Sequence, residues 1–297
     1  MTAPLRVRSF AKINLALQVL GRRADGFHEI RTVLQTIDLA DELELRAANG
    51  LKLRTAGSAA LESLPHEKNL VWRAASELAA RHAPGRGADI VLHKRIPLGA
   101  GLGGGSSNAA AALLGLSRLW ELGLGPEELS ALAAGLGSDV PFFLEGGTAL
   151  GVGRGEEIYA LPDADAPPVV VVFPGVAVST AEAYRALDLE LTSQRNANRI
   201  QRFCSRLASR SGFLTEIFND FESSILPAHA AILEAKSFLE RSGATAALLC
   251  GSGSSVFGFF PEEESALAAS RVAVRDSWRV FPAKTLSRAE YFHRMFE

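Results

Sequence analysis

Residues Pro97 to Asn108 read PLGAGLGGGSSN, a run with five glycines between a predicted strand over 88–96 and a predicted alanine-rich helix over 108–122. Glycines let a backbone adopt conformations closed to other residues and approach a ligand closely. The helix that follows offers unpaired N–H groups and the positive end of its dipole, which together bind anions. The pattern therefore predicts a cradle for a phosphate group, to which Ser106 and Ser107 would add hydroxyl donors or a magnesium ligand.

Three alternatives to a phosphate cradle fit this glycine loop less well. Gly99, Gly101 and Gly104 formally satisfy the G-x-G-x-x-G pattern of dinucleotide-binding folds. However, Glu121, near the offset of the expected ribose-binding acid, falls within the predicted helix rather than at a strand end. No Gly-Lys-Ser/Thr follows, which excludes a Walker loop. A flexible linker would normally contain more polar spacer than separates this strand from this helix.

The overall composition is that of an ordinary globular protein. The chain has 297 residues, which at about 150 residues per domain suggests roughly two domains. Hydrophobic residues make up 47%, enough to fill a sizeable core and to exclude wholesale disorder. The net charge of −2 argues against a dedicated nucleic-acid binder, which usually carries a strongly basic face.

Cysteine content and hydropathy indicate where such a protein works. Cys204 and Cys250 are far apart in the sequence, which argues against a disulfide framework and a cysteine-based zinc site. The first residues lack the apolar core of a signal peptide, and no apolar run approaches the roughly 18 residues of a membrane span. We therefore expect a protein of the reducing cytoplasm with no membrane partner.

Hydrophobic periodicity predicts a mixture of strands and helices. Strands are expected over 9–17, 42–46, 51–54, 88–96, 169–173, 246–250, 255–260 and 279–285. Helices are expected over 69–82, 108–122, 126–136, 180–187, 198–211, 228–241 and 262–276. Asn49-Gly50 lies between two alternating segments and indicates a hairpin. Because strands and helices do not alternate regularly, we expect the α+β class with two lobes, residues 1–160 and 161–297.

Four further segments concentrate polar residues. The strand over 9–17 places Lys12 and Asn14 on one face, because side chains two apart share a side. Residues 21–29, GRRADGFHE, form a turn with groups that can grip a polar ligand. In residues 137–143, GSDVPFF, Asp139 either caps the next helix or accepts a hydroxyl proton. Residues 251–255, GSGSS, form either a polar hairpin turn or a second glycine loop that closes over the substrate.

Together and in this order, these segments resemble the GHMP kinase superfamily, and the resemblance covers nearly the whole chain. It implies a two-lobed fold in which Asp139 is the catalytic aspartate, a general base for the substrate hydroxyl. Lys12 matches the catalytic lysine, which holds that aspartate ionised and stabilises the alkoxide. The implied phosphoryl donor is ATP with Mg²⁺. The implied ATP-binding residues are Asn69, near the adenine, and Lys94, Pro97, Gly99, Gly101, Gly103, Gly104, Gly105, Ser106 and Ser107.

A narrower resemblance concerns the substrate. Residues 11–15, AKINL, together with 23–29, RADGFHE, and with GSDVPFF, are similar to the kinases that phosphorylate the 2-hydroxyl of a cytidine-diphosphate-linked methylerythritol in the non-mevalonate isoprenoid pathway. The implied substrate-binding residues are Asn14, Phe27, His28, Thr180 and Tyr184.

The chain departs from this narrower pattern at two positions. These kinases commonly have tyrosine where this chain has Phe27. Stacking on cytosine needs only the ring face, so we expect binding to persist without the hydroxyl's hydrogen bond. Ala100 stands in a run that is often all glycine, and it is tolerated only with a negative φ.

The sequence thus predicts an ATP-dependent small-molecule kinase, and it is also compatible with other functions. One is a GHMP kinase for another small alcohol, such as mevalonate or homoserine. A second is a catalytically inactive GHMP-fold protein that only binds a ligand. An NAD-binding dehydrogenase fits less well, because its chemistry would not require Lys12 together with Asp139. The oligomeric state is open.

Overall fold

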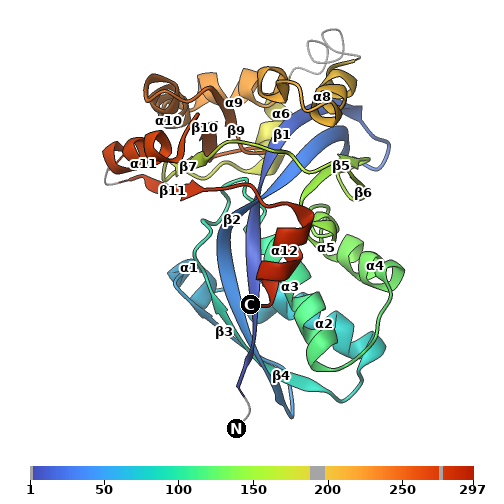
Figure 1. Ribbon diagram of the computed structural model, residues 1–297. Helices are drawn as coiled ribbons and strands as arrows, with labels where there is room; N and C mark the ends of the chain where they lie inside the picture. The colour runs from blue at the N-terminus through green and yellow to red at the C-terminus, as the bar shows by residue number, and fades with distance from the viewer. Residues whose placement is uncertain (1–2, 188–197, 274–276) are drawn as a thin grey trace.

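The structure is a computed structural model that describes residues 3–187, 198–273 and 277–297 (Figure 1). These residues form two sheets, one of seven strands and one of four, with helices packed on both. The long strands β1 (Leu5–Arg22) and β2 (His28–Ala48) run from the lower lobe of Figure 1 into the upper lobe. The expected α+β class with two lobes is confirmed, whereas the domain boundary near residue 160 stays a prediction.

The seven-stranded sheet has the order β3-β4-β2-β1-β8, with β5 paired to β2 and β6 paired to β5. Its shorter strands are β3 (Lys52–Ala56), β4 (Gly87–His93), β5 (Thr148–Val152), β6 (Glu157–Ala160) and β8 (Phe218–Asn219). The helices that accompany its lower part are α1 (Ala59–Glu62), η1 (His66–Lys68), α2 (Leu70–His82), α3 (Gly104–Leu119), α4 (Pro126–Leu136) and α5 (Phe142–Glu145).

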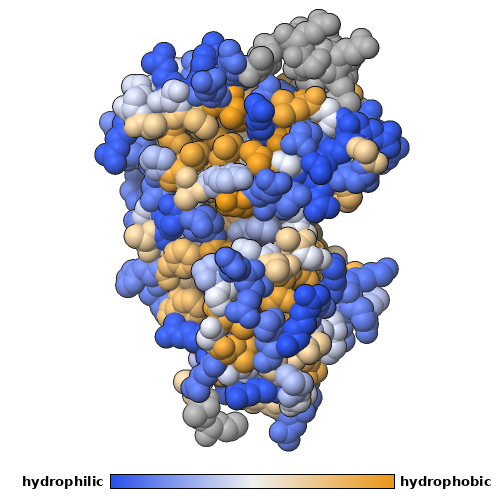
Figure 2. Space-filling model, turned by 90° about the vertical axis from the view of Figure 1, so that its right-hand side faces the viewer, coloured by the Kyte–Doolittle hydropathy of each residue, from blue (hydrophilic) through white to orange (hydrophobic). Residues whose placement is uncertain are grey.

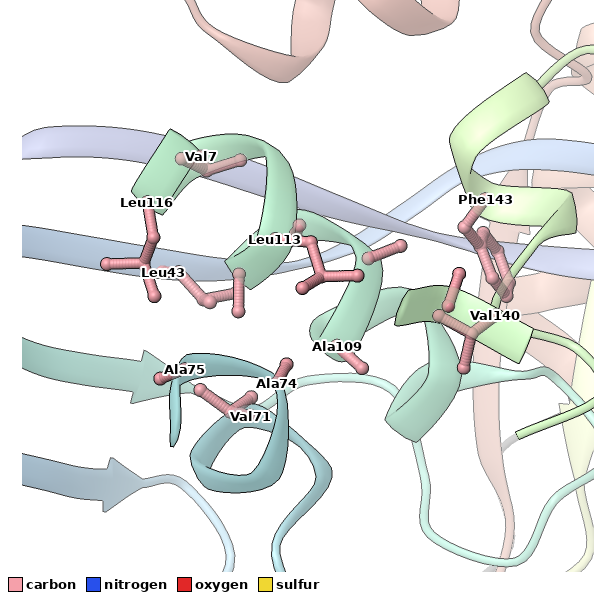
Figure 3. Packing of buried hydrophobic residues seen from close by; sticks show 14 of the residues in the cluster. Val7, Leu43, Val71, Ala74, Ala75, Ala109, Leu113, Leu116, Val140 and Phe143 are labelled. Atoms are coloured by element: carbon pink, nitrogen blue, oxygen red, sulfur yellow. The ribbon is translucent and has the colours of Figure 1, made fainter. Parts of the chain in front are cut away.

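The core of the lower lobe lies between this sheet and helices α2 and α3 (Figure 3). Val7 and Leu43 from the strands meet Leu113 and Leu116 of α3, and all four are fully buried. A Cβ on Gly115 would lie 2.5 Å from a Leu45 methyl group, so α3 rests directly on the sheet. This contact fixes the C-terminal half of α3 on the sheet, while the N-terminal end of the same helix continues the glycine loop.

The four-stranded sheet of the upper lobe has the order β11-β7-β10-β9. Its strands are β7 (Val169–Phe173), β9 (Ala246–Leu249), β10 (Val256–Phe259) and β11 (Arg279–Ala283). The helices of this lobe are α6 (Thr180–Ala186), α8 (Arg199–Ala208), η2 (Phe213–Glu216), α9 (Glu222–Ala228), α10 (Ala230–Arg241) and α11 (Glu263–Val272). Val169 and Val171 enter one apolar cluster while Val170 and Val172 enter another, which explains the unbroken valine run.

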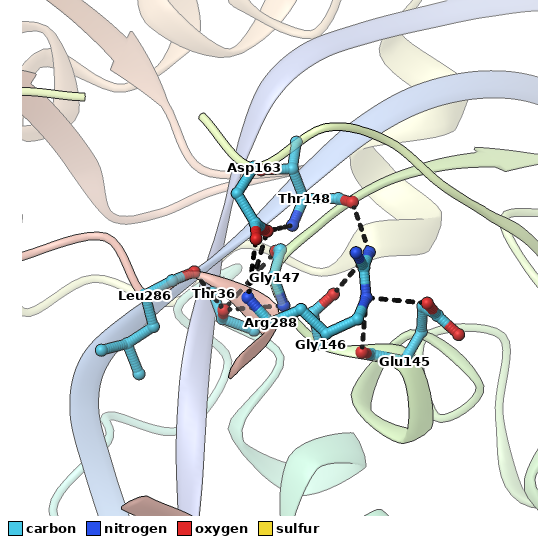
Figure 4. Close-up of polar contacts among 8 residues, drawn as sticks. All are labelled: Thr36, Glu145, Gly146, Gly147, Thr148, Asp163, Leu286 and Arg288. Atoms are coloured by element: carbon cyan, nitrogen blue, oxygen red, sulfur yellow. Dashed lines mark hydrogen bonds and ion pairs between the residues drawn. The ribbon is translucent and has the colours of Figure 1, made fainter. Parts of the chain in front are cut away.

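The last helix, α12 (Arg288–Met295), returns to the lower lobe and braces α5. The Arg288 guanidinium donates to the carbonyls of Glu145, Gly146 and Thr148, and pairs with the Glu145 carboxylate at 2.8 Å (Figure 4). The Tyr291 hydroxyl donates to the Phe143 carbonyl at 2.6 Å. Since α5 follows Asp139 directly, the end of the chain helps to position the candidate catalytic carboxylate.

The predicted hairpin at Asn49-Gly50 is wrong. Strand β4 lies between the two segments, antiparallel to β2 and parallel to β3. The backbone of Gly87 packs so closely on Gly50 that a Cβ there would lie 2.3 Å from the Gly50 nitrogen. Alternation identified both strands, but it carries no information about which edges pair.

Two further expectations need correction. The helix expected over 108–122 begins at Gly104 and ends at Leu119, so half of the glycine loop belongs to its first turn. Asp139 does not cap a helix, because α5 begins at Phe142 with Pro141 before it and no side-chain cap. The sequence also indicated only part of β2 and missed β5, β6, α9 and α12. By contrast, the predictions for 126–136 and 169–173 are confirmed in both bounds.

The surface of the molecule is that of an ordinary globular protein, as the amino-acid composition predicts. The face in Figure 2 carries charged and polar side chains, with apolar ones between them on both lobes. Among the residues described, no helix has the length and apolar character to cross a membrane.

Candidate active site

A cavity of about 970 Å³ gathers residues from both halves of the chain. It is bounded by the glycine loop, β1, the turn between β1 and β2, α6, and the loop between β9 and β10. The predicted site residues that line it are Lys12, Asn14, Phe27, His28, Gly99, Gly101, Gly103, Ser106, Asp139, Thr180 and Tyr184. Those that do not line it are Asn69, Lys94, Pro97, Gly104, Gly105 and Ser107.

The glycine loop is held between the two lobes. The backbone N–H of Lys12 donates to the carbonyl of Leu102 at 3.0 Å, which fastens the loop to β1. Gly101 has φ +77°, and a Cβ on it would lie 2.0 Å from the Cys250 carbonyl oxygen. Glycine is therefore required at this position both by conformation and by space. Ala100 does not have a positive φ, so alanine is tolerated at this position as expected. Its carbonyl oxygen accepts a hydrogen bond from the Ser255 N–H at 3.1 Å.

The start of α3 presents backbone N–H groups and one serine beside this loop. Gly103, in the left-handed conformation, precedes the first helical residue, Gly104. The first N–H groups of a helix have no partner within it, and the helix dipole adds positive potential there. Ser106, in the first turn, lines the cavity. The expected phosphate cradle thus consists of backbone N–H groups beside one serine hydroxyl.

A buried polar network lies beneath the cradle. The Asp41 carboxylate pairs with Lys94 and accepts hydrogen bonds from Arg95 N, at 2.6 Å, and from Ile96 N, at 2.7 Å. It also accepts from Asn108 Nδ2 at 2.8 Å. The Lys94 and Asp41 side chains are 2% and 0% exposed. Burial lowers the pKa of Lys94, and Asp41 opposes that shift. Lys94 therefore supports the loop from below.

The remaining predicted ATP-side residues lie around the same cradle. The Ser107 hydroxyl accepts from Ser9 Oγ at 2.8 Å and faces the sheet rather than the cavity. Asn69 caps α2, accepting from the Val71 N–H at 2.9 Å. A Cβ on Gly105 would lie 3.6 Å from a Leu70 methyl group, so the N-terminal ends of α2 and α3 are neighbours. Pro97 is buried just before the loop.

Lys12 and Asp139 meet in the cavity. The Lys12 Nζ lies 3.7 Å from Asp139 Oδ2, and the side chains are 5% and 41% exposed. Lys12 Nζ also donates to Asn14 Oδ1 at 2.8 Å, while Asn14 Nδ2 donates to Thr32 Oγ1 at 2.8 Å. The ammonium is thus fixed by a chain of side chains on β1 and β2, and the carboxylate beside it is open to a hydroxyl group.

The turn between β1 and β2 forms the far wall. Arg23 pairs with Asp25 at 3.1 Å and with Glu29 at 2.5 Å, which closes the turn. The Phe27 ring is 52% exposed, and the His28 ring stacks on Tyr184 with centroids 4.4 Å apart. Burial, with a contribution from the Asp139 charge, raises the pKa of Tyr184 to about 12, so its hydroxyl is neutral at physiological pH.

The loop over 251–255 is both a hairpin turn and part of the cavity wall, the two interpretations that its sequence allowed. It joins the antiparallel pair β9 and β10 as a hairpin, and it also lines the cavity through Gly251, Ser252 and Gly253. The Ser252 and Thr180 hydroxyls lie 3.1 Å apart, which links this loop to α6. Asn219 Nδ2 donates to the Gly251 carbonyl at 2.7 Å.

Several residues of the site are not among those predicted from the sequence. Thr32 and Arg154 line the cavity, and Asn219 and Asp41 hold its loops. Arg154 stands between two glycines in the glycine-rich run 151–155, so a local signal does mark it, whereas Thr32, Asp41 and Asn219 stand in stretches without one. Within the described ranges, no three His, Cys, Asp or Glu side chains form a group that could hold a metal ion.

The lobed fold and the phosphate cradle define the class of GHMP kinases. The model of the GHMP kinases N terminal domain matches residues 69–147, and that of the GHMP kinases C terminal matches 193–278. The chain is 44% identical to the 4-diphosphocytidyl-2-C-methyl-D-erythritol kinase of Solibacter usitatus, over 98% of this chain and 91% of that protein. It is 40% identical to the protein of the same name in Geobacter sulfurreducens, over 95% and 99%.

Solved structures agree with these relatives. A crystal structure of 4-(cytidine 5′-diphospho)-2C-methyl-D-erythritol kinase superposes with a TM-score of 0.79 at 34% identity, covering 94% of this chain and 98% of that one. Homoserine kinase from Cytophaga hutchinsonii, at 18% identity and a TM-score of 0.75, shares the fold. The chain therefore belongs to the 4-diphosphocytidyl-2-C-methyl-D-erythritol kinase family within the GHMP kinases.

Proposed function

We propose that this chain transfers the γ-phosphoryl group of ATP to the hydroxyl at position 2 of 4-diphosphocytidyl-2-C-methyl-D-erythritol, a step of non-mevalonate isoprenoid precursor biosynthesis. The observation that carries the proposal is the meeting of Lys12 and Asp139, 3.7 Å apart, in one cavity with the glycine loop and the Phe27–His28 turn. A phosphoryl donor and a nucleotide-linked alcohol would thus both reach the same carboxylate.

The chemistry follows from the charges at this point. Asp139 takes the proton of the substrate hydroxyl, whose oxygen forms a bond to the γ-phosphorus while the bond to the β,γ-bridging oxygen breaks and ADP leaves. The Lys12 ammonium, 3.7 Å from Asp139 Oδ2, stabilises negative charge on the attacking oxygen. Asn14 keeps that ammonium in place through its 2.8 Å hydrogen bond. Catalysis therefore consists of alignment and charge stabilisation.

The glycine loop and the start of α3 would hold the ATP phosphates, with Asn69 and the α2 start towards the adenine. Among the oxygen-bearing side chains that line the cavity, Ser106 of the glycine loop and Asp139 beside Lys12 are the ones we expect to hold Mg²⁺. Such a set fits this ion, which is usually held by one or two protein ligands together with substrate phosphates and water. When bound, Mg²⁺ would neutralise phosphate charge during transfer.

A coupled ADP-release assay with Mg-ATP and three alcohols tests this function. The panel contains 4-diphosphocytidyl-2-C-methyl-D-erythritol, mevalonate and homoserine. We expect turnover with the first alone. Turnover with another alcohol would retain the kinase class but overturn the substrate assignment of Phe27 and His28. Binding of ATP without turnover of any alcohol would favour a binding protein.

We further infer that the enzyme acts in the cytoplasm on small molecules, without a nucleic-acid or membrane partner. The net charge of −2 and the free thiols of Cys204 and Cys250 support this inference. Cell fractionation with an antibody against the chain tests it, and recovery in the membrane or nucleoid fraction would contradict it.

A further inference from the structure

Three arginines line the cavity around the aromatic turn, and none has a role in the chemistry above. Arg22 ends β1, Arg154 lies in the turn between β5 and β6, and Arg185 lies in α6 beside Tyr184. Among the described residues that line the cavity, Asp139 is the one with a carboxylate. Together with Lys12, the arginines make this cavity strongly positive.

Arg154 is held with its guanidinium towards the turn. Its Nε donates to Glu156 Oε1 at 2.9 Å, and its backbone N–H donates to Glu156 Oε2 at 2.6 Å. The guanidinium carbon lies 4.9 Å from the centroid of the Phe27 ring. Glu156 thus fixes the plane of the guanidinium through Nε, which leaves the terminal nitrogens able to donate to a ligand.

The other two arginines have no acidic partner in the part of the chain that the structure describes. Arg22 is exposed and pairs in register with His28, and its charge adds to burial in lowering the pKa of that histidine. Arg185 is exposed, and its Nε donates to the Ala181 carbonyl at 3.2 Å. Within residues 3–187, 198–273 and 277–297 neither guanidinium is paired with a carboxylate, so both can donate to an anion.

We propose that Arg22, Arg154 and Arg185 bind the diphosphate that links the cytidine to the methylerythritol. This proposal rests on the proposed function. In that substrate the diphosphate joins the base, expected at the Phe27–His28 turn, to the alcohol, expected at Lys12 and Asp139. It must therefore cross the cavity between these two groups. Guanidinium groups bind phosphate oxygens with two parallel hydrogen bonds, which suits them to this bridge.

The arginines are distinct from the groups that would bind ATP. The phosphate cradle of the glycine loop is built from backbone N–H groups and is supported by Lys94 and Asp41 from below. Arg22, Arg154 and Arg185 stand instead on β1, on the β5–β6 turn and on α6, around the aromatic wall. Two separate anion sites in one cavity match two separate phosphate groups, one in each substrate.

Isothermal titration calorimetry tests this site. The R22Q, R154Q and R185Q variants and the wild type are titrated with 4-diphosphocytidyl-2-C-methyl-D-erythritol and with cytidine, while a non-hydrolysable ATP analogue saturates the phosphate cradle. We expect each variant to bind the diphosphate ligand about tenfold more weakly, with cytidine affinity nearly unchanged. The difference in affinity for the diphosphate ligand between each variant and the wild type should become smaller at high salt. R46Q, which removes an exposed arginine near the other end of β2, is the matched control.

The outcomes separate this proposal from the proposed function. If R154Q weakens both ligands equally, Arg154 only supports Phe27 and its place in the diphosphate site is overturned. If all three variants keep the wild-type preference for the diphosphate ligand, the whole site is overturned while the kinase activity stands. If the wild type binds and turns over no cytidine-diphosphate-linked alcohol, the proposed function itself fails.

Discussion

The phosphate cradle and the aromatic wall of the same cavity are built in opposite ways. The cradle consists of backbone groups on a buried base, where Asp41 accepts from three neighbours and pairs with Lys94. The aromatic wall consists of side chains on an exposed turn, with Phe27 half open to solvent and Arg154 over its ring. The phosphate cradle is held rigid by its buried base, whereas the binding properties of the aromatic wall depend on which side chains stand there.

This difference matches what each side would have to recognise. A nucleotide phosphate is the shared requirement of kinases of this class, and backbone N–H groups bind it without depending on particular side chains. The alcohol substrate differs among such kinases, so its recognition falls to residues that can be exchanged without disturbing the core. Substitutions on the cradle side should therefore affect stability and ATP binding, and those on the wall should affect the choice of alcohol.

The largest effect is expected where the two sides meet. D139N removes the proposed proton acceptor, and we expect turnover to fall about a thousandfold. The fold should persist, because the side chain is 41% exposed. The ADP-release assay measures turnover, and circular dichroism checks folding. D89N, which breaks the surface pair with Arg54, is the control and should keep wild-type turnover. Equal activity of both variants would remove Asp139 from the chemistry.

The next effect tests the rigidity of the cradle. D41N leaves the buried Lys94 ammonium without its anion, which should lower the free energy of unfolding by about 3 kcal/mol or more. Urea unfolding measures this value, and D89N, at an exposed pair, should cost less than about 1 kcal/mol. The double variant D41N/K94M removes both charges and keeps an amide oxygen that can accept a backbone hydrogen bond, so it should recover part of the loss. Equal stability of D41N and the wild type would contradict a rigid base.

A third test separates close packing from backbone strain. In G101A the new Cβ would lie 2.0 Å from the Cys250 carbonyl at φ +77°, so the loop must move and the KM for ATP should rise about tenfold. G123A is the matched control, since Gly123 has φ +61° with nothing within 4 Å. It should lose stability while keeping ATP affinity. Similar KM values for both variants would argue that the loop tolerates displacement.

A fourth test concerns the aromatic wall. F27A removes a face on which a base can stack, and we expect the KM for the cytidine-linked alcohol to rise about tenfold with ATP affinity unchanged. F27Y adds only a hydroxyl to a ring that is 52% exposed, so its KM should stay within about threefold of the wild type. Steady-state kinetics with each substrate varied in turn measure both. A change in the KM for ATP would break the separation of the two sides.

The smallest expected effect is a shift in the pH dependence of kcat/KM for the alcohol substrate. Burial, and then the charge of Arg22, lower the pKa of His28 below 6.5. The neutral ring therefore persists below that pH, and kcat/KM for the alcohol should decline only as the pH falls through the lowered pKa. In R22Q a neighbouring positive charge is absent, so this acid limb should move upward towards 6.5. An identical limb in both proteins would show that His28 does not control it.

The sequence alone determined the features that depend on neighbouring residues. The sequence predicts the phosphate cradle because glycines and a helix start are adjacent in the chain. It predicts the helix over 126–136 from a proline at its start and the strand over 169–173 from an unbroken valine run. The family resemblance also named Lys12 and Asp139 as partners, although nothing in their local sequence indicates that they meet.

Only the tertiary structure decided the features that join distant segments. It placed β4 between β2 and β3, brought Lys12 to Asp139, buried Asp41 beside Lys94 and gathered three arginines in the cavity that Phe27 also lines. Periodicity reports which face of a strand or helix is buried, but it does not report which element covers that face. Those pairings depend on how the whole chain packs, so they become visible only when the complete fold is known.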